Sequence, residues 1–474
     1  MRIALINPPT SREQLYGNWD LSSVDTYSPP LGLLYMAAYL REHGHDLRVV
    51  DFPATKTAYG ETLDSICEFG PDVVGLSAMT INIFNANQIA VDLRKRATRA
   101  EVVIGGAHFT AVPVESLERF PEIDCGVMGE GEITLQELAK AIEEGADRGT
   151  VDGLVWRNED GEIVVNRPRE LIQDLDELPY PAWDLLPDFP DSYPHSPLEV
   201  KRLPAASIIT SRGCPHQCTF CDRSVFGSRV RHHGADYTIG MIRHLKDEYR
   251  VKDFMILDDN FLLDKQKLDR ICNVVVSERM DLKWYCLSHV KFMTEDRLQA
   301  VKAAGCWVME VGIESGCERV LKHLKRNTKK EKIATAIKTA KDLGIKVKGN
   351  FIFGLPTETK ESLEETIDFA KSIDISLFQQ NFLTVFPGCE IALDAEKYGF
   401  LESDWDRLSL WQITFVPFGL SKDDLLRASK KAYREFYLRP RIMFEILLSI
   451  TSPRAFRSAF SALTAFTKSL VRRS

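Results

Sequence analysis

The stretch Arg212-Gly213-Cys214-Pro215-His216-Gln217-Cys218-Thr219-Phe220-Cys221-Asp222 places three cysteines at a C-x3-C-x2-C spacing. A 4Fe–4S cluster offers four iron corners, and thiolates are its usual ligands. Three thiolates on one short loop can hold three corners and leave the fourth iron open to a small molecule. A zinc site would need a fourth protein ligand, often from a second C-x2-C or a histidine pair, and no such pair stands at a suitable distance. The spacing therefore predicts an iron–sulfur cluster, with a zinc loop or three unrelated thiols as the alternatives.

Length and composition describe an ordinary globular chain. Its 474 residues suggest about three domains of ~150 residues each. The net charge of -8 gives no overall basic surface for nucleic acid, and ten cysteines are too few for a disulfide scaffold. Neither a signal-peptide pattern nor an apolar run of about 20 residues is present, so we expect a cytoplasmic protein. A reducing compartment would also protect an oxygen-sensitive cluster.

Residues 1–148 alternate apolar strand runs with amphipathic helices. This alternation predicts a doubly wound parallel sheet of the Rossmann-like type. Ligands of such sheets bind at the carboxyl ends of the strands. The strands are expected at Ile3–Ile6, Asp46–Val50, Val73–Ser77, Val102–Ile104 and Cys125–Met128.

The rest of the chain divides into three parts. Residues 149–200 form a connector with a hairpin around Gly161 and a proline-rich segment. Residues 201–395 contain six strand–helix repeats, which predict a partial (β/α)6 barrel with the cysteine loop at the carboxyl end of its first strand. Residues 396–474 are expected to be mostly helical. The six strands are expected at Ala206–Thr210, Asp253–Leu257, Lys283–Leu287, Trp307–Val311, Lys346–Phe353 and Phe378–Thr384.

The C-terminal segment is basic and amphipathic. From Leu438 onward there are seven basic residues and one acidic residue, Glu445. Phe456, Phe460, Leu463 and Leu470 share one face at helical spacing. Two interpretations stay open: peripheral contact with an anionic membrane through these basic helices, or docking of the apolar face on the barrel.

The cysteine motif resembles the signature of the radical SAM superfamily, in which an aromatic residue such as Phe220 precedes the third cysteine. Residues 1–145 resemble the cobalamin-binding domain that precedes the barrel in one subgroup. The strings that carry this likeness are Pro29-Pro30-Leu31-Gly32-Leu33, Ile104-Gly105-Gly106-Ala107-His108, Gly129-Glu130-Gly131-Glu132 and Leu175-Asp176-Glu177-Leu178-Pro179-Tyr180-Pro181.

The resemblance implies that the open iron of the cluster chelates S-adenosylmethionine (SAM). One electron then cleaves SAM to a 5′-deoxyadenosyl radical, which the barrel shields from water. A low-potential donor of the flavodoxin or ferredoxin type would supply the electron. The family's Gly-Gly-Glu is replaced here by Asp258-Asp259-Asn260. Its G-x-I-x-G-x-x-E pattern appears as Asn350, Ile352, Gly354 and Thr357, so two of the four positions differ. The resemblance implies that the backbone at Gly354 approaches the adenine of SAM. The implied ligands are Cys214, Cys218 and Cys221 for the cluster, and Phe220, Asp258, Asp259, Glu314, Gly354 and Pro387 for SAM.

The resemblance also implies a cobalamin site at the carboxyl edge of the first sheet. The D-x-H-x-x-G motif that supplies a lower cobalt ligand is absent, so we expect cobalamin without such a ligand, and His108 as a hydrogen-bonding loop residue. A corrinoid-free domain retained for packing is the alternative. The implied contacts are Asn7, Ser77, Met79, Thr80, Gly105, Gly106, His108, Gly129 and Glu130.

The family implies an enzyme that uses the cluster, SAM and cobalamin together. Methylation of an unactivated carbon of a small-molecule or lipid-like substrate is the first hypothesis. Oxidative ring closure, as in anaerobic Mg-protoporphyrin monomethyl ester cyclases, is the second, and a non-catalytic corrinoid-binding sensor is the third. The sequence assigns no general acid or base.

Overall fold

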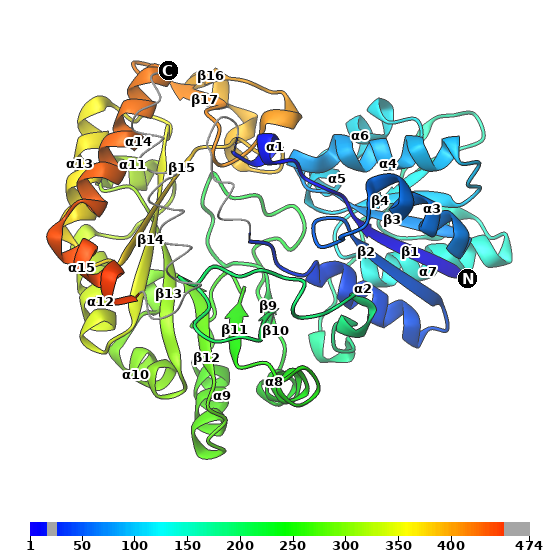
Figure 1. Cartoon of the computed structure of the whole chain (residues 1–474). Helices are drawn as coiled ribbons and strands as arrows, with labels where there is room; N and C mark the ends of the chain where they lie inside the picture. The colour runs from blue at the N-terminus through cyan, green and yellow to red at the C-terminus, as the bar shows by residue number, and fades with distance from the viewer. Residues whose placement is uncertain (17–25, 450–474) are drawn as a thin grey trace.

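The computed structural model describes residues 1–16 and 26–449. Its N-terminal part is built on a seven-stranded sheet with strand order β2-β1-β3-β4-β5-β6-β7 (Figure 1). The first five strands are parallel, as predicted. The strands are β1 (Arg2–Asn7), β2 (Asp46–Asp51), β3 (Val73–Ser77), β4 (Glu101–Gly105), β5 (Cys125–Val127), β6 (Leu154–Arg157) and β7 (Ile163–Val165).

This sheet is covered on both faces, which confirms the doubly wound fold. Alternate residues of β1 enter different cores: Leu5 packs with the helices α2 and α7, whereas Ile6 packs with α3, α4 and α6. Burial on both faces explains why the strands read as continuous apolar runs. The helices are α1 (Arg12–Tyr16), α2 (Leu31–Glu42), α3 (Tyr59–Phe69), α4 (Ile83–Lys95), α5 (Ala107–Ala111), α6 (Pro113–Arg119) and α7 (Gly131–Glu144).

The hairpin β6–β7 extends this sheet instead of standing apart as a connector. β6 pairs antiparallel with β5, with Cys125 opposite Trp156 and Val127 opposite Leu154. Antiparallel addition needs no crossover helix, so a hairpin can join the edge of a parallel sheet directly. The domain boundaries expected from the sequence remain predictions.

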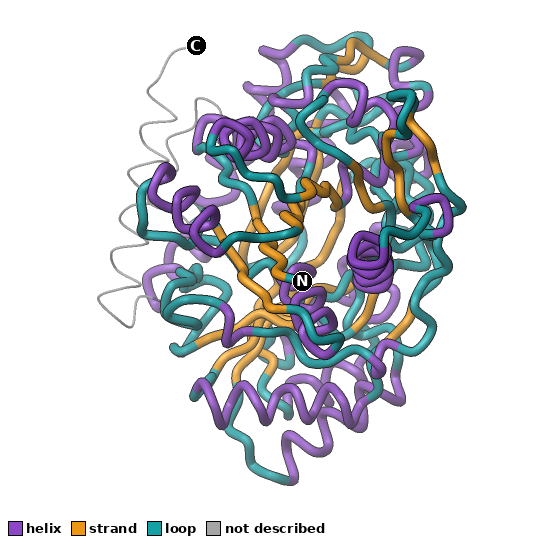
Figure 2. Tube along the Cα trace, turned by 90° about the vertical axis from the view of Figure 1, so that its right-hand side faces the viewer, coloured by secondary structure: helices purple, strands orange, loops and turns teal. Residues whose placement is uncertain are grey.

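The second sheet has six parallel strands in the order β8-β11-β12-β13-β14-β15. The strands lie in the order of the sequence, and each crossover between neighbouring strands contains a helix. This gives the expected partial barrel, with β8 and β15 at its two edges. Figure 1 shows the helices along its outer side, whereas the inner side faces the N-terminal part. In Figure 2, strands run through the middle of the molecule with helices around them. The strands are β8 (Ala205–Ile208), β11 (Asp253–Ile256), β12 (Lys283–Ser288), β13 (Cys306–Glu314), β14 (Lys346–Phe353) and β15 (Leu377–Phe382).

Strand alternation decides what the barrel contains. Phe254, Trp284 and Met309 point outward into the core shared with the helices, whereas Met255 and Tyr285 point inward. The outer helices are α8 (Ala235–Tyr249), α9 (Lys265–Ser277), α10 (Glu295–Ala303), α11 (Glu318–His323), α12 (Lys330–Asp342) and α13 (Lys360–Ser372). A short ribbon, β9 (Ser211–Arg212) with β10 (Arg231–His232), brackets the cysteine loop.

The C-terminal region begins with a small two-stranded sheet that the sequence did not indicate. β16 (Gly399–Leu401) pairs with β17 (Phe415–Pro417), and α14 (Lys422–Tyr437) and α15 (Pro440–Ser449) follow. Between the two strands, the 3-10 helix η8 (Trp405–Arg407) packs on the N-terminal part. The membrane-contact hypothesis for the segment 451–474 lies outside the described residues. Among those described, no helix is long and apolar enough to cross a membrane.

Candidate functional site

The cysteine loop (residues 213–222) lies at the carboxyl end of the barrel, between β9 and β10. It begins at Gly213, which has a φ of 92° and would place a Cβ 2.5 Å from the carbonyl oxygen of Arg229. Only glycine fits this close approach. Within the loop, the amide of Cys221 donates to the carbonyl of Cys218 at 3.2 Å. This tight turn keeps Cys218 and Cys221, two of the predicted cluster ligands, close together.

The three thiols influence one another and are served by hydrogen-bond donors. Burial raises the pKa of Cys214 and of Cys218, and desolvation with the neighbouring thiols raises that of Cys221 to about 12, although solvent reaches its side chain. The Asn260 Nδ2 donates to the Cys214 Sγ at 3.3 Å, and the Arg326 Nη1 to the Cys218 Sγ at 3.8 Å. N–H donors and a cation stabilise thiolate, so the loop suits an anionic cluster.

Arg326 is a site residue that sequence reasoning missed. Its guanidinium contacts Cys218, the carbonyl of Gly312 and the Glu314 Oε1, the last at 2.9 Å. Glu314 ends β13 with a φ of 69°, an unusual conformation for a residue with a Cβ. Burial raises the pKa of Glu314, and Arg326 opposes that rise. The pair joins the end of β13 to the cysteine loop, so Glu314 stands beside the predicted cluster.

The adjacent aspartates after β11 have different environments. Asp258 is 2% exposed, and it accepts hydrogen bonds from the Thr210 amide and hydroxyl at 2.6 and 2.7 Å and from the Ser211 hydroxyl at 2.6 Å. Asp259 is exposed, accepts no hydrogen bond from the described residues, and lies close enough to raise the pKa of Cys214. We therefore propose Asp259, rather than Asp258, as the carboxylate that faces the ammonium group of SAM.

The end of β14 is organised by Glu358, which lies one residue beyond the motif position given to Thr357. The Glu358 Oε2 accepts from the amides of Gly354 and Leu355 at 2.6 and 3.1 Å. Burial raises the pKa of Glu358 to about 8. Gly354 has a φ of 84°, which favours glycine, and its missing Cβ faces Leu425. Glu358 thus fixes the backbone whose approach to adenine was predicted.

The other two predicted SAM contacts pack around the cysteine loop. Phe220 lies against the cluster of apolar side chains that includes Leu355 and Cys389. Pro387 is half-buried and precedes Gly388, where a Cβ would lie 2.4 Å from the Asp222 Oδ1. The loop after β15 therefore closes directly on the cysteine loop.

The N-terminal loops at the predicted cobalamin site are open in part. Met79, in the loop after β3, is 58% exposed, and a Cβ built on Gly129 would meet nothing within 4 Å. Gly106 has a φ of 102° and a Cβ there would lie 2.5 Å from the Ala78 carbonyl oxygen, so it holds the two loops together. Gly105, by contrast, packs against Val127. Ser77 is half-buried beside them.

Three predicted cobalamin contacts, Asn7, Thr80 and His108, are hydrogen-bonded to other residues of the protein. The Asn7 Nδ2 donates to the Asp51 Oδ1 at 2.7 Å. His108 is fully buried; its Nδ1 lies 3.1 Å from the Thr80 Oγ1, and its ring meets Trp405 edge-on at 4.3 Å. Burial and then Arg119 lower the pKa of His108 to about 4, so it is neutral near pH 7. The Nδ1 contact with Thr80 agrees with the expected hydrogen-bonding role of His108.

Glu130 belongs to a buried interdomain charge cluster, which we define as Glu130, Glu132, Arg212 and Arg231. The Arg212 guanidinium bridges Glu130 and Glu132, and the Arg231 Nη1 contacts the other oxygen of Glu130, each at 2.7 Å. All four residues are at most 7% exposed. The carboxylates precede or begin α7, whereas the arginines lie on the ribbon that brackets the cysteine loop. We propose that Glu130 tethers the two parts instead of contacting cobalamin.

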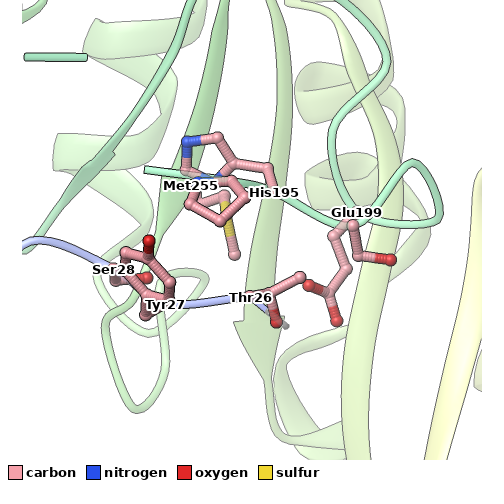
Figure 3. Close-up of a pocket in the computed structure, with 8 residues that line it drawn as sticks. Thr26, Tyr27, Ser28, His195, Glu199 and Met255 are labelled. Atoms are coloured by element: carbon pink, nitrogen blue, oxygen red, sulfur yellow. The ribbon is translucent and has the colours of Figure 1, made fainter. Parts of the chain in front are cut away.

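The barrel interior carries a polar wall next to a pocket (Figure 3). Lys348 of β14 pairs with Glu199 at 2.8 Å and with Glu310 of β13 at 3.0 Å, and Tyr285 and Asn350 also donate to Glu310. Glu199 projects into a pocket of about 100 Å³. The pocket is lined by Thr26, Tyr27, Ser28, Pro194, His195, Ser196, Glu199 and Met255.

Comparison with known families agrees with this arrangement. A B12 binding domain matches residues 19–139, and the radical SAM superfamily matches residues 208–370. Fold, site and both matches define an enzyme with a B12-binding domain followed by a radical SAM domain, and the chain belongs to this family. The recognition from the cysteine motif is thereby confirmed.

Individual relatives differ in activity. An uncharacterized methyltransferase of Pyrococcus horikoshii is 34% identical over 447 residues, which cover 94% of each chain. The anaerobic magnesium-protoporphyrin IX monomethyl ester cyclase of Rubrivivax gelatinosus is 26% identical, covering 92% of this chain and 78% of its own. The solved structure of the cobalamin-dependent SAM radical enzyme OxsB, with aqua-cobalamin and SAM bound, has a TM-score of 0.76 at 17% identity and covers 98% of this chain and 71% of that one. This last likeness concerns the fold.

Proposed function

We propose that the protein methylates an unactivated carbon of a small, polar molecule, using a 4Fe–4S cluster, SAM and cobalamin. The observation that carries the proposal is the placement of the cysteine loop opposite the open loops after β3 and β5, with the buried interdomain charge cluster between the two parts. In this proposal Cys214, Cys218 and Cys221 hold the cluster. When bound, the cluster and SAM supply one-electron cleavage of a sulfonium, and cobalamin supplies a methyl carrier.

The residues around the cysteine loop orient and shield the reacting groups. Asp259 offers an unpaired carboxylate to the SAM ammonium, a charge-assisted hydrogen bond that also fixes the direction of the molecule. Two more polar groups lie at the ends of neighbouring strands: Glu314, which is held by Arg326, and the backbone amides at Gly354, which are fixed by Glu358. The barrel wall excludes water from the reaction space.

A polar substrate is supported by the interior of the barrel. The wall formed by Glu310, Lys348 and Asn350 offers charges and amide groups, and the pocket beside it adds hydroxyl groups. The Asn350 Oδ1 is buried without a hydrogen-bond partner among the described residues, which suits a donor from a ligand. A purely hydrocarbon substrate would leave this oxygen desolvated and unpaired, at a cost of about 1–3 kcal/mol.

Oxidative ring closure is the competing activity, because the cyclase relative covers most of the chain. The test incubates anaerobically reconstituted protein with methyl-labelled SAM, dithionite and a deproteinised extract of small molecules. We expect 5′-deoxyadenosine together with label in a new small-molecule product. If the labelled methyl group stays in SAM and its own cleavage products, and an unlabelled oxidised product forms, the result would favour cyclisation. Absence of 5′-deoxyadenosine, at the level of a Cys218→Ala control, would favour the sensor hypothesis.

A further inference from the structure

A basic segment leaves the barrel beside the cysteine loop. Residues 322–332 contain six lysines and arginines and a single acidic residue, Glu331. The whole chain, by contrast, has a net charge of -8. The segment links α11 to the first turn of α12. Its charge is therefore a local feature that the composition does not predict.

Most of this charge faces solvent without a partner. Lys322, Lys329 and Lys332 are exposed and Lys330 is half-buried, and none of the four forms a salt bridge with the described residues. Within the segment, Lys325 pairs with Glu390 and Arg326 with Glu314. Unpaired lysines at a surface attract anionic partners.

The basic segment touches the cysteine loop directly. The Thr219 amide donates to the Leu324 carbonyl at 3.4 Å, and Arg326 reaches the Cys218 Sγ. On another side of the loop, the His216 ring stacks on His289 with centroids 4.1 Å apart, and Phe292 follows at 6.0 Å from His216. Lys291, exposed beside Phe292, lies on the 3-10 helix η5 (Val290–Phe292), which packs against α12.

We propose that Lys291, Lys322, Lys329, Lys330 and Lys332, named here the basic collar, dock an acidic one-electron carrier protein over the cysteine loop. The carrier loses one electron and is oxidised, and the cluster gains that electron and passes from the 2+ to the 1+ state. The His216–His289 stack lies between the cysteine loop and the 3-10 helix that carries Lys291. This proposal rests on the proposed function for the identity of the electron acceptor.

The position of the basic collar distinguishes an electron carrier from other negatively charged partners. Nucleic acid and anionic membranes also bind lysine clusters. A nucleic-acid or membrane site gains nothing from contact with the cysteine loop, whereas an electron carrier must approach it. Pro215 and Gln217, within the loop itself, are exposed and complete the approach surface.

The test uses the full chain and a purified acidic flavodoxin as the probe. The collar variant is Lys322→Glu, Lys329→Glu and Lys332→Glu. The matched control reverses three exposed lysines elsewhere: Lys95→Glu, Lys140→Glu and Lys252→Glu. Binding to fluorescently labelled flavodoxin is measured on apoprotein, and reduction of the reconstituted cluster is followed by the loss of visible absorbance with either flavodoxin hydroquinone or dithionite.

We expect the collar variant to bind flavodoxin at least about tenfold more weakly at low salt, and to be reduced by it at least about tenfold more slowly. At about 1 M salt the difference should vanish, because the Debye length falls to about 3 Å. Reduction by the small ion dithionite should be unchanged. Three results would overturn the proposal. The control variant could lose flavodoxin binding equally, or the collar variant could bind flavodoxin as the wild type does. The third is collar-dependent binding of polyadenylate or anionic vesicles with no flavodoxin binding. If dithionite-reduced protein fails to cleave SAM, the proposed function falls while the binding result still stands.

Discussion

Two loops at the carboxyl ends of parallel sheets each carry a pair of carboxylates, and the two pairs have different surroundings. Glu130 and Glu132, before and within the first turn of α7, are both buried against arginines. Of Asp258 and Asp259, after β11, the first is buried with three hydrogen-bond donors and the second is exposed. The difference teaches that a carboxylate at a ligand-binding edge is available to a ligand only where the protein leaves it unpaired.

The largest expected effect comes from breaking the buried interdomain charge cluster. Glu130→Ala leaves Arg231 and part of Arg212 buried without a counter-charge, so we expect the free energy of unfolding to fall by about 3–5 kcal/mol. The control is Arg41→Ala, which breaks an exposed bidentate pair with Asp184 and should cost at most about 1 kcal/mol. Urea unfolding of the apoprotein measures both. If both variants lost the same free energy of unfolding, the buried interdomain charge cluster would contribute no more than an exposed ion pair.

The second prediction separates the two aspartates. Asp258→Asn keeps one acceptor oxygen but presents an NH2 group to hydroxyl and amide donors, so we expect a loss of stability of about 2 kcal/mol. Asp259→Asn should change stability by less than about 0.5 kcal/mol. It should weaken SAM binding to the reconstituted protein about 10- to 100-fold, since it removes a charged hydrogen bond of about 1.5–3 kcal/mol. Equilibrium dialysis with labelled SAM checks this; undiminished affinity in Asp259→Asn would end its assignment.

The smallest effect concerns His108, at the edge where cobalamin was predicted. Burial lowers its pKa to about 4, whereas the unfolded chain titrates near the ordinary value of 6.5. Between those two pH values the unfolded state binds a proton that the native state does not, so stability falls as the pH falls. We expect the wild type to lose about 1 kcal/mol more than His108→Gln between about pH 7 and about pH 5.5. Urea midpoints at both pH values test this, and parallel losses would show that His108 is not held neutral.

The fold was predictable because it depends on local patterns. Apolar runs alternating with amphipathic helices indicated both parallel sheets, and the cysteine spacing indicated the radical SAM family. The β16–β17 sheet was missed because its strands are only three residues each. The attachment of β6–β7 to β5 was missed because pairing between edges leaves no periodic signal.

The site was less predictable because its roles depend on contacts between distant residues. Glu130 resembled a cofactor-loop residue, and its arginine partners lie 82 and 101 positions away. Arg326 likewise reaches Cys218 across 108 positions. For Glu358, the carboxylate one position past Thr357 was a usable signal. A one-residue shift of the family pattern would have found it.

Electron paramagnetic resonance of the anaerobically reconstituted, dithionite-reduced protein tests most directly whether one loop holds a cluster open to SAM. We predict a signal from about four irons per chain that changes when SAM is added. It should disappear in each of Cys214→Ala, Cys218→Ala and Cys221→Ala, and persist in Cys286→Ala, which alters a buried core thiol. A wild-type signal that ignores SAM, or a full cluster in the variants of the loop, would contradict the account.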